Sequence, residues 1–351
     1  MAWQGVLGHD DVVARFRRAL QRGRLASSFL FVGPDGIGKR RFAFGLAQAL
    51  LCSTRPETLM DPCGICPTCV QVRGLTHPDL DYVCKPEDKS FLPLELLVGE
   101  KDKRGKEGLC HRLSMKPFMG GRKVAIIDDA DYLNPEGANS LLKTLEEPPP
   151  RSVLILIGTS PAKQLPTIRS RCQIIRFQPL DTSIVSKILV DNGLVESPED
   201  AQRVAQQSGG SVRRATELTD QSLWGIRNTI WEGLSQPQID CVGLSAEILR
   251  FAEETGREGP ARRERLRQAI GAATEFYEHV LRRTCSIPSS EVLYPLPIGQ
   301  GTDRFGPAEA GIVARCLERC LDAAEQVDRH AYPATLIECW LDDLAAQWFP
   351  G

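Results

Sequence analysis

The sequence predicts an α/β domain with a mostly parallel sheet, followed by helical regions that continue to the end of the chain. Short apolar runs alternate with helical patterns from residue 5 to about residue 179, as in βαβ units. A glycine-rich turn joins the first apolar run directly to a helical pattern. Beyond this part the apolar spacing is helical, and we expect separate helical regions at residues 180–220 and 221–351.

Four apolar runs are the predicted strands of the first domain, residues 1–179. The runs SFLFVG (28–33), KVAIID (123–128) and SVLILIG (152–158) are apolar almost throughout, as expected for strands that are buried on both faces of a sheet. The run QIIRF (173–177) is the predicted fourth strand.

Helix boundaries are marked by prolines, glycines and capping residues. Asn134 and Pro135 favour a helix start, and the prolines at 148–150 end that helix. The pair Gly209 and Gly210 ends a later helix, after which Ser211 caps the next one. Long amphipathic helices are predicted at 261–284 and 310–327, with the Pro- and Gly-rich segment 286–307 between them.

Composition places the chain among folded, water-soluble proteins. Its 351 residues are 42% hydrophobic and 25% charged, which suits two or three globular domains. The formal net charge of −2 gives no overall attraction to nucleic acid. There is no membrane-spanning apolar run and no signal peptide at the start of the sequence, so we expect a cytoplasmic protein with reduced cysteines and no membrane partner.

The turn GPDGIGKR (33–40) has the pattern of a phosphate-binding loop. Gly33, Gly36 and Gly38 allow the backbone to wrap around phosphates, and Lys39 can reach the terminal phosphates of ATP or ADP. A chance glycine-rich turn is the alternative, and the flanking strand and helix argue against it. The following residue, Arg40, replaces the Ser or Thr that ligates magnesium in such loops.

Two acidic residues end the predicted strand at 123–128. Asp128 lies where a magnesium-binding aspartate is expected, and Asp129 stands where a catalytic glutamate is usual. The shorter Asp129 side chain is poorly suited to polarise an attacking water. The simpler alternative is two acids that solvate a strand end, and the nearby phosphate loop makes it less attractive.

Four cysteines follow the phosphate-loop helix in the pattern C-x10-C-x2-C-x2-C. Cys52, Cys63, Cys66 and Cys69 supply four thiolates, which suit a structural zinc ion in tetrahedral coordination. Scattered free cysteines are the alternative, although two overlapping C-x2-C pairs rarely arise by chance. We expect the other eight cysteines to fill cores as small apolar residues.

The segment NSLLKTLEEPPPRSVLILIGTSPAKQLPTIRSRCQIIRF (139–177) resembles the AAA+ subunits of bacterial replicative clamp loaders, the gamma/tau and delta-prime subunits of DNA polymerase III. The resemblance extends over residues 5–218. It implies an AAA+ RecA-like P-loop domain at 1–179 that carries a zinc module at about 52–69. It also implies a helical lid at 180–220, and an oligomerisation collar at 221–351.

The resemblance assigns roles to two arginines. Arg171 in SRC matches the arginine finger that reaches in trans into the ATP site of the adjacent subunit, and a permanently charged guanidinium suits a transition-state phosphate. Arg213 in GGSVRRA matches a sensor-2 arginine that faces the chain's own nucleotide. For a lone arginine such as Arg171, the alternative is a surface or loop-packing role.

Arg40 and Asp129 favour a delta-prime-type subunit over a gamma/tau-like subunit that hydrolyses ATP itself. The resemblance then implies a non-hydrolysing or weakly hydrolysing partner for gamma/tau and delta-type subunits, which acts on the sliding clamp and primed DNA through the assembly. A P-loop nucleotide kinase is a third alternative, and it explains neither SRC nor the cysteines. The basic segment 98–108 reads as an inserted, solvated loop, with contact to DNA phosphate as its alternative.

Overall fold

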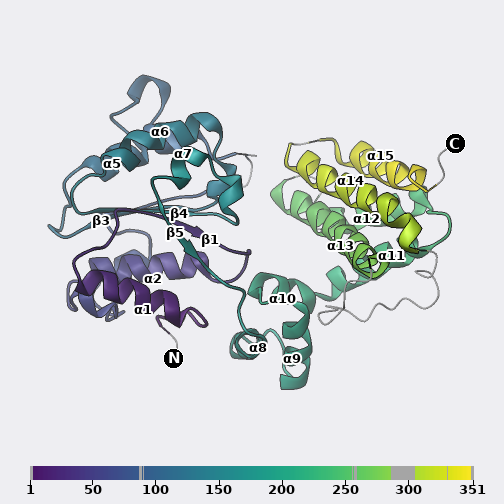
Figure 1. Ribbon diagram of the computed structural model, residues 1–351, viewed down its shortest axis with the longest axis horizontal. Coiled ribbons are helices and arrows are strands. Elements are labelled where there is room, and N and C mark those ends of the chain that lie inside the picture. The colour runs from purple at the N-terminus through teal and green to yellow at the C-terminus, as the bar shows by residue number, and fades with distance from the viewer. Residues whose placement is uncertain are drawn as a thin grey trace. The chain divides into compact units, whose positions relative to one another are not determined.

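The protein forms two compact units, Met1–Ala215 and Thr216–Gly351. The structure is a computed structural model and describes residues 3–86, 89, 91–254, 256, 259–285, 305–329 and 331–348. Figure 1 colours the first unit from purple to teal and the second from green to yellow. The division into domains 1–179, 180–220 and 221–351 remains a prediction.

The first unit contains a five-stranded sheet in the order β2-β3-β4-β1-β5, in which every neighbouring pair is parallel. The predicted parallel α/β architecture is therefore confirmed. The sequence analysis missed β2, because its four residues LDYV include the acidic Asp81 and form no apolar run. The strands are β1 Ser28–Val32, β2 Leu80–Val83, β3 Lys123–Ile127, β4 Ser152–Ile157 and β5 Gln173–Arg176.

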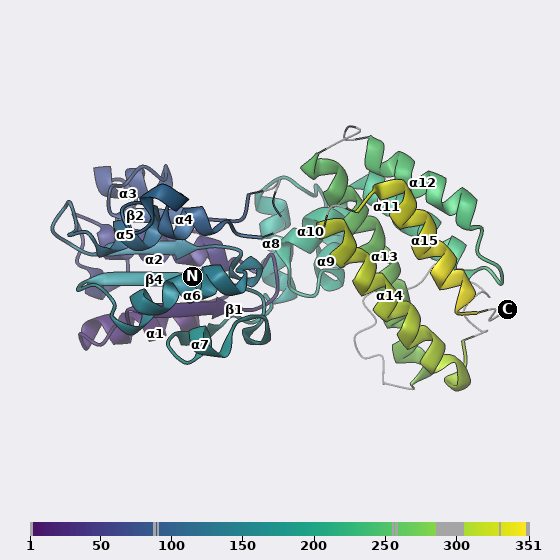
Figure 2. The same ribbon diagram turned by 90° about the horizontal axis from the view of Figure 1, so that it is seen from above.

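Both faces of the sheet are covered by helices, as the unbroken apolar strands predict. Phe29 and Phe31 of β1 belong to the core shared with α1 (Asp10–Gln21) and α2 (Lys39–Leu51). The alternate residue Leu30 belongs to the opposite core. That core is shared with α4 Leu94–Val98, α5 Gly108–Ser114 and α6 Pro135–Glu146. Figure 2 shows α1, α2 and α6 around β1 and β4.

Helix α6 begins and ends where the sequence predicts. The amide of Gly137 donates to Asn134 Oδ1 at 2.7 Å, and Pro135 occupies the first helical position. The helix ends at Glu146, just before the three prolines. A short helix, α7 Pro166–Arg169, precedes β5.

Three helices follow the sheet. They are α8 Thr182–Asp191, α9 Pro198–Gln207 and α10 Val212–Thr219. Gly209 and Gly210 adopt the positive φ values of 59° and 78° that separate α9 from α10, and the Arg214 amide donates to Ser211 Oγ at 3.2 Å. The predicted helix end and cap are confirmed. A Cβ at Gly210 would lie 2.5 Å from the Leu180 carbonyl oxygen, so only glycine fits there without strain.

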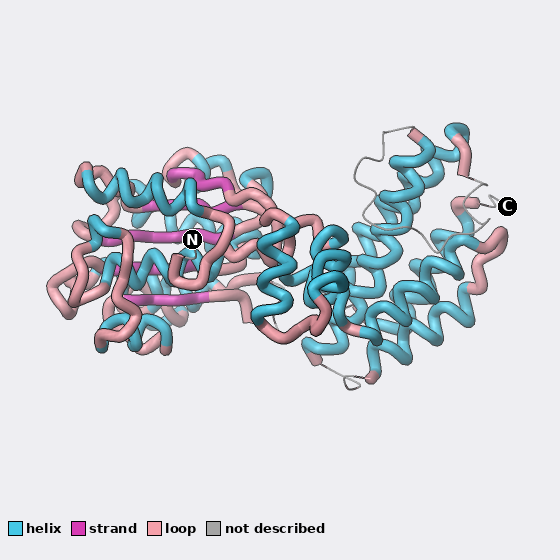
Figure 3. Tube along the Cα trace, turned by 90° about the horizontal axis from the view of Figure 1, so that it is seen from below, coloured by secondary structure: helices cyan, strands magenta, loops and turns pink. Residues whose placement is uncertain are grey.

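The described part of the second unit is helical, as Figure 3 shows and as the sequence predicts. Its core is built around Trp231, Phe276, Tyr277 and Trp340, all nearly inaccessible to solvent. Residues 286–304 of the predicted irregular segment 286–307 lie outside the described residues. The helices are α11 Gln221–Ser235, α12 Cys241–Glu253, α13 Pro260–Thr284, α14 Ala310–Asp328 and α15 Pro333–Ala346.

The eight cysteines outside the four-cysteine cluster do not behave alike. Cys172, Cys316 and Cys320 are buried, as predicted for small core residues. The prediction is wrong for Cys285 and Cys339, which are exposed. Cys285 directly follows the last residue of α13.

The segment 98–108 forms an exposed loop over residues 100–107, with a short 3-10 turn at Lys101–Lys103. Lys103 pairs with Glu107 at 3.0 Å. The loop is exposed to solvent, as predicted. Within the described parts of the chain, no helix combines the length and apolar composition needed to cross a bilayer.

The α6 cap provides a test of the fold. We expect Asn134→Ala to reduce the free energy of unfolding by about 1 kcal/mol, because the Gly137 amide loses its acceptor. Asn134→Asp keeps an acceptor at this position and serves as the matched control. Urea denaturation followed by circular dichroism measures both, and equal midpoints for Asn134→Ala and the unmodified chain would contradict the assigned cap.

Candidate functional site

The loops that follow β1, β3 and β4 meet at the carboxyl edge of the sheet, where open α/β sheets bind ligands. The loop after β1 is Gly33–Gly38, and β3 ends immediately before Asp128. The Gly33 amide donates to the Thr159 carbonyl at 3.1 Å, which joins the loop after β1 to the loop after β4. The structure therefore brings the predicted phosphate loop and the acidic motif together.

The phosphate loop has the backbone shape that its glycines predict. Gly36 and Gly38 adopt φ values of 74° and 97°, and Gly38 directly precedes the first residue of α2. A Cβ at Gly33 would lie 2.4 Å from the Phe177 carbonyl oxygen. The loop thus leads tightly into the N-terminus of α2, whose free amides favour an anion.

The side chain of Lys39 is buried inside the loop, with 7% of it exposed. Its Nζ donates to the carbonyl oxygens of Gly33 and Pro34, both at 2.6 Å. Burial lowers the pKa of Lys39, and nearby carboxylates, that of Asp35 first, oppose this shift. A bound phosphate would have to replace these two carbonyl oxygens as the acceptor of the Lys39 hydrogen bonds.

Asp128 is surrounded by protein donors. Its Oδ1 accepts the Asp129 amide at 3.0 Å, and its Oδ2 accepts the Tyr82 hydroxyl at 3.3 Å. Nη1 of Arg40 lies 3.6 Å from the same Oδ2. Magnesium requires oxygen ligands in octahedral geometry. Arg40 supplies no oxygen and places a cation beside the one predicted carboxylate ligand, so these residues do not fit a magnesium ion.

Asp129 lies beside Asp128 in a strained backbone conformation with φ 55°. Burial raises the pKa of Asp129, and the neighbouring charge of Asp128 raises it further. The negative charge of Asp129 is therefore disfavoured at this position. The expectation that Asp129 is a poor substitute for a catalytic glutamate rests on its shorter side chain.

Arg213 is placed against the phosphate loop through its backbone. The Val212 amide donates to the Gly36 carbonyl at 3.0 Å, and Ser211 Oγ donates to the Asp35 carbonyl at 2.7 Å. A Cβ at Gly36 would lie 2.5 Å from the Cβ of Arg213. The start of α10 therefore contacts the phosphate loop, and the side chain of Arg213 is exposed there. The sensor role of Arg213 remains a prediction.

Three further residues shape this edge, and the sequence analysis did not single them out. Asp131 accepts the Thr159 amide at 2.8 Å and the side-chain amide of Gln164 at 2.9 Å. Nε2 of the buried His9 lies 2.7 Å from the Ile37 carbonyl oxygen. Tyr82, described above, is the third. Asp131 was visible as the last acid of DDAD, whereas contacts of His9 and Tyr82 depend on residues distant in the sequence.

Arg171 lies apart from this site. It precedes β5 by two residues, at the amino edge of the parallel sheet, whereas the phosphate loop follows β1 at the carboxyl edge. Nη2 of Arg171 pairs with Glu146 Oε1 at 2.7 Å, and Nη1 donates to the Thr167 carbonyl at 3.0 Å. The acidic end of α6 therefore has a basic partner close by.

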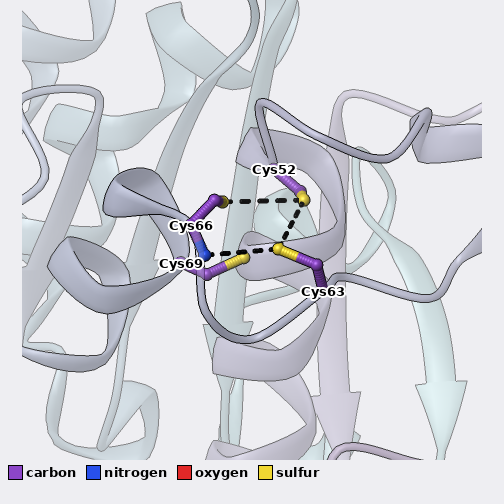
Figure 4. A group of neighbouring side chains, drawn as sticks. All are labelled: Cys52, Cys63, Cys66 and Cys69. Atoms are coloured by element: carbon purple, nitrogen blue, oxygen red, sulfur yellow. Dashed lines mark hydrogen bonds between the residues drawn. The ribbon is translucent and has the colours of Figure 1, made fainter.

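The four cysteines predicted as metal ligands converge (Figure 4). Their sulfur atoms all lie within 4.8 Å of one another. The Sγ atom of Cys52 lies 3.8 Å from that of Cys63 and 3.9 Å from that of Cys66. A zinc–sulfur bond of about 2.3 Å gives a tetrahedron with an edge of about 3.8 Å. The spacing therefore fits a zinc ion at Cys52, Cys63, Cys66 and Cys69.

Hydrogen bonds prepare these sulfur atoms for a cation. The Arg55 amide donates to Cys52 Sγ at 3.4 Å, and the Cys66 amide donates to Cys63 Sγ at 3.3 Å. Although burial opposes it, hydrogen bonding that begins with Thr68 lowers the pKa of Cys66 to about 4. Burial raises the pKa of Cys69, so metal binding at neutral pH would release a proton from this thiol.

The cysteine cluster is joined to the core of the first unit. Cys52 directly follows α2, and Cys69 lies on α3 (Pro67–Arg73). Gln48 of α2 donates to the Cys69 carbonyl at 2.9 Å. Met60 is fully buried, in the same core as α1 and α2. A metal at this site would therefore be a structural support and would not face the phosphate loop.

Comparison with known proteins points to one group of replication proteins. Residues 8–181 match the protein-family profile described as "DNA polymerase III, delta subunit". The chain is 35% identical over 216 residues to DNA polymerase III subunit delta' of Pseudomonas aeruginosa, and the match covers 61% of this chain and 62% of that protein. For subunit delta' of Bacillus subtilis the identity is 33% over 201 residues, covering 57% and 56%.

Subunits of the gamma/tau type match the chain over a similar length. The identity to the gamma/tau subunit of Mycobacterium tuberculosis is 33% over 228 residues, covering 64% of this chain and 37% of that protein. The chain thus spans less than two thirds of the length of each of these relatives. A gamma-subunit-related protein of Thermotoga maritima aligns over 96% of this chain and 98% of its own, with 17% identity and a TM-score of 0.37.

The cysteine cluster yields a direct test. We expect one zinc ion per chain by elemental analysis, and a large drop in melting temperature after chelation, because the four thiolates lose the cation that holds them together. Cys63→Ser should lose most of the zinc. Cys285→Ser, which alters an exposed cysteine outside the cluster, is the control and should keep it. Full zinc content in Cys63→Ser would rule out the assigned ligand set.

Proposed function

This chain belongs to the clamp-loader subunit family of DNA polymerase III, and from this premise we propose that it is a delta-prime-type subunit. In this role it supplies Arg171 in trans to the ATP site of a neighbouring gamma/tau-type subunit during loading of a sliding clamp on primed DNA. Its own hydrolysis of ATP is absent or weak. The proposed partners are gamma/tau-type and delta-type subunits, in the cytoplasm.

The position of Arg171 is the observation that carries this proposal. It lies at the amino edge of the sheet, and the chain's own phosphate loop lies at the carboxyl edge. An arginine placed there lies away from the chain's own phosphate loop, which supports a role at a phosphate of another subunit. The side chain of Arg171 is 33% exposed, and its guanidinium stays charged at any physiological pH. Both properties suit a residue that reaches a neighbour's nucleotide.

The chain's own site supports the second half of the proposal. Arg40 occupies the position of a magnesium ligand and lies beside Asp128. Asp129 is one methylene shorter than a catalytic glutamate, so its carboxylate is poorly placed to activate water. Without a bound metal and without a well-placed carboxylate, phosphoryl transfer loses two of its main aids.

A gamma/tau-like ATPase is the second candidate. Two observations favour it, namely the intact loop geometry around Lys39 and the 33% identity to a gamma/tau subunit over 228 residues. The proposed zinc ion stabilises the module at residues 52–69 in either case. The proposed roles of residues 180–220 as a lid and of 221–351 as a collar are also common to both candidates.

We expect Arg171→Ala to abolish ATP turnover at the neighbouring site of the assembled clamp loader, by about 10³-fold or more, because an arginine finger contributes that much to phosphoryl transfer. Turnover is measured in an assembly in which only this neighbouring site is catalytically intact. Arg169→Ala removes another exposed arginine two positions earlier and serves as the matched control. Unchanged turnover in Arg171→Ala, with assembly intact by native mass measurement, would reject the finger role.

The purified chain separates the two candidates. We expect its ATP turnover with magnesium to stay at the background of the buffer, because Arg40 and Asp129 replace the metal ligand and the catalytic carboxylate. A gamma/tau-type subunit measured in parallel shows that the assay detects turnover. Sustained hydrolysis by the isolated chain, lost in Lys39→Ala, would favour the gamma/tau-like candidate.

A further inference from the structure

The residues around this phosphate loop do not fit a magnesium ion, and an ion pair in the structure gives the reason. Arg40 is the second residue of α2, and Asp128 directly follows β3. Arg40 Nη1 and Asp128 Oδ2 lie 3.6 Å apart. A positive charge thus already lies beside the carboxylate on which a magnesium ion would depend.

Asp128 is held in this arrangement from a neighbouring strand. Tyr82 of β2, which pairs with β3, donates its hydroxyl to Asp128 Oδ2 at 3.3 Å, while the Asp129 amide donates to Oδ1 at 3.0 Å. Only 13% of the Asp128 side chain is exposed. A metal ion would have to displace these donors and approach a guanidinium that does not lose its proton.

The charges around the loop suit a ligand that carries no metal. Lys39 is buried within the loop, and the side chain of Arg40 is 65% exposed at the mouth of the loop. A guanidinium presents its donors in a planar fork, so one edge can face Asp128 while another faces a phosphate oxygen. Two adjacent cations and the amides of the α2 N-terminus favour a highly charged polyphosphate.

We propose that the guanidinium of Arg40 takes the place of magnesium in this site, so that the chain binds a metal-free nucleoside triphosphate. The inference rests on the proposed assignment of this loop as the chain's own nucleotide site. It is independent of the finger role of Arg171. Such a site holds nucleotide as a structural ligand, because Arg40 cannot activate water as a hydrated metal does.

The experiment measures binding of a fluorescent ATP analogue to the full chain, in excess magnesium and in excess EDTA. For the unmodified chain we expect clearly tighter binding in EDTA than in magnesium, because excess magnesium converts the analogue in solution into a metal complex that this site does not accept. For Arg40→Thr, which restores a hydroxyl ligand and removes the competing charge, we expect at least ten-fold tighter binding in magnesium than in EDTA. This pair of ratios identifies Arg40 as the residue that excludes the metal.

Arg41→Thr is the matched control, since it alters the adjacent exposed arginine on the same helix and should keep the ratio of the unmodified chain. The proposal is overturned if the unmodified chain binds as tightly, or more tightly, with magnesium than with EDTA. It is also overturned if the unmodified chain binds no nucleotide under either condition. Neither result changes the expected loss of turnover at the neighbouring site in assemblies that carry Arg171→Ala. Failure of this inference and failure of the proposed function are therefore distinguishable.

Discussion

The site depends on one constraint, the parallel pairing of β4 with β1 on one side and with β3 on the other. In a parallel sheet every strand ends at the same edge, so segments that are more than a hundred residues apart in the sequence meet there. The bond from the Gly33 amide to the Thr159 carbonyl and the bonds that Asp131 accepts from Thr159 and Gln164 then fix the loops to one another. The phosphate loop therefore receives its shape from the sheet as much as from its glycines.

Charge decides what this well-formed loop can do. The fold supplies the same backbone amides whether or not the site hydrolyses ATP, and the difference lies in a few side chains at its rim. Arg40 beside Asp128 provides a positive charge that cannot dissociate. Asp129 lies in a buried position where its negative charge is disfavoured. These side chains suit the proposed role, in which the loop holds an anion and cleaves it weakly or not at all.

Much of this protein was predictable because its signals are local. The buried strands, the α6 cap and the turn at Gly209 and Gly210 each follow from neighbouring residues, and the four cysteines are close in the chain. The failures have a common physical origin. Strand β2 gains its burial from partners, and exposure of Cys339 depends on how α15 packs. The pairs Tyr82–Asp128 and Glu146–Arg171 join residues 46 and 25 positions apart, which no periodic pattern reveals.

The pairing of Arg171 with Glu146 has a consequence for the proposed finger. Both side chains are partly exposed, 33% and 51%, and such a surface ion pair contributes only about 0–1 kcal/mol. Glu146 therefore orients the guanidinium without trapping it, and a triphosphate with several negative charges outcompetes a single carboxylate. In the proposed finger role, the arginine can therefore leave Glu146 for a neighbour's nucleotide at little energetic cost.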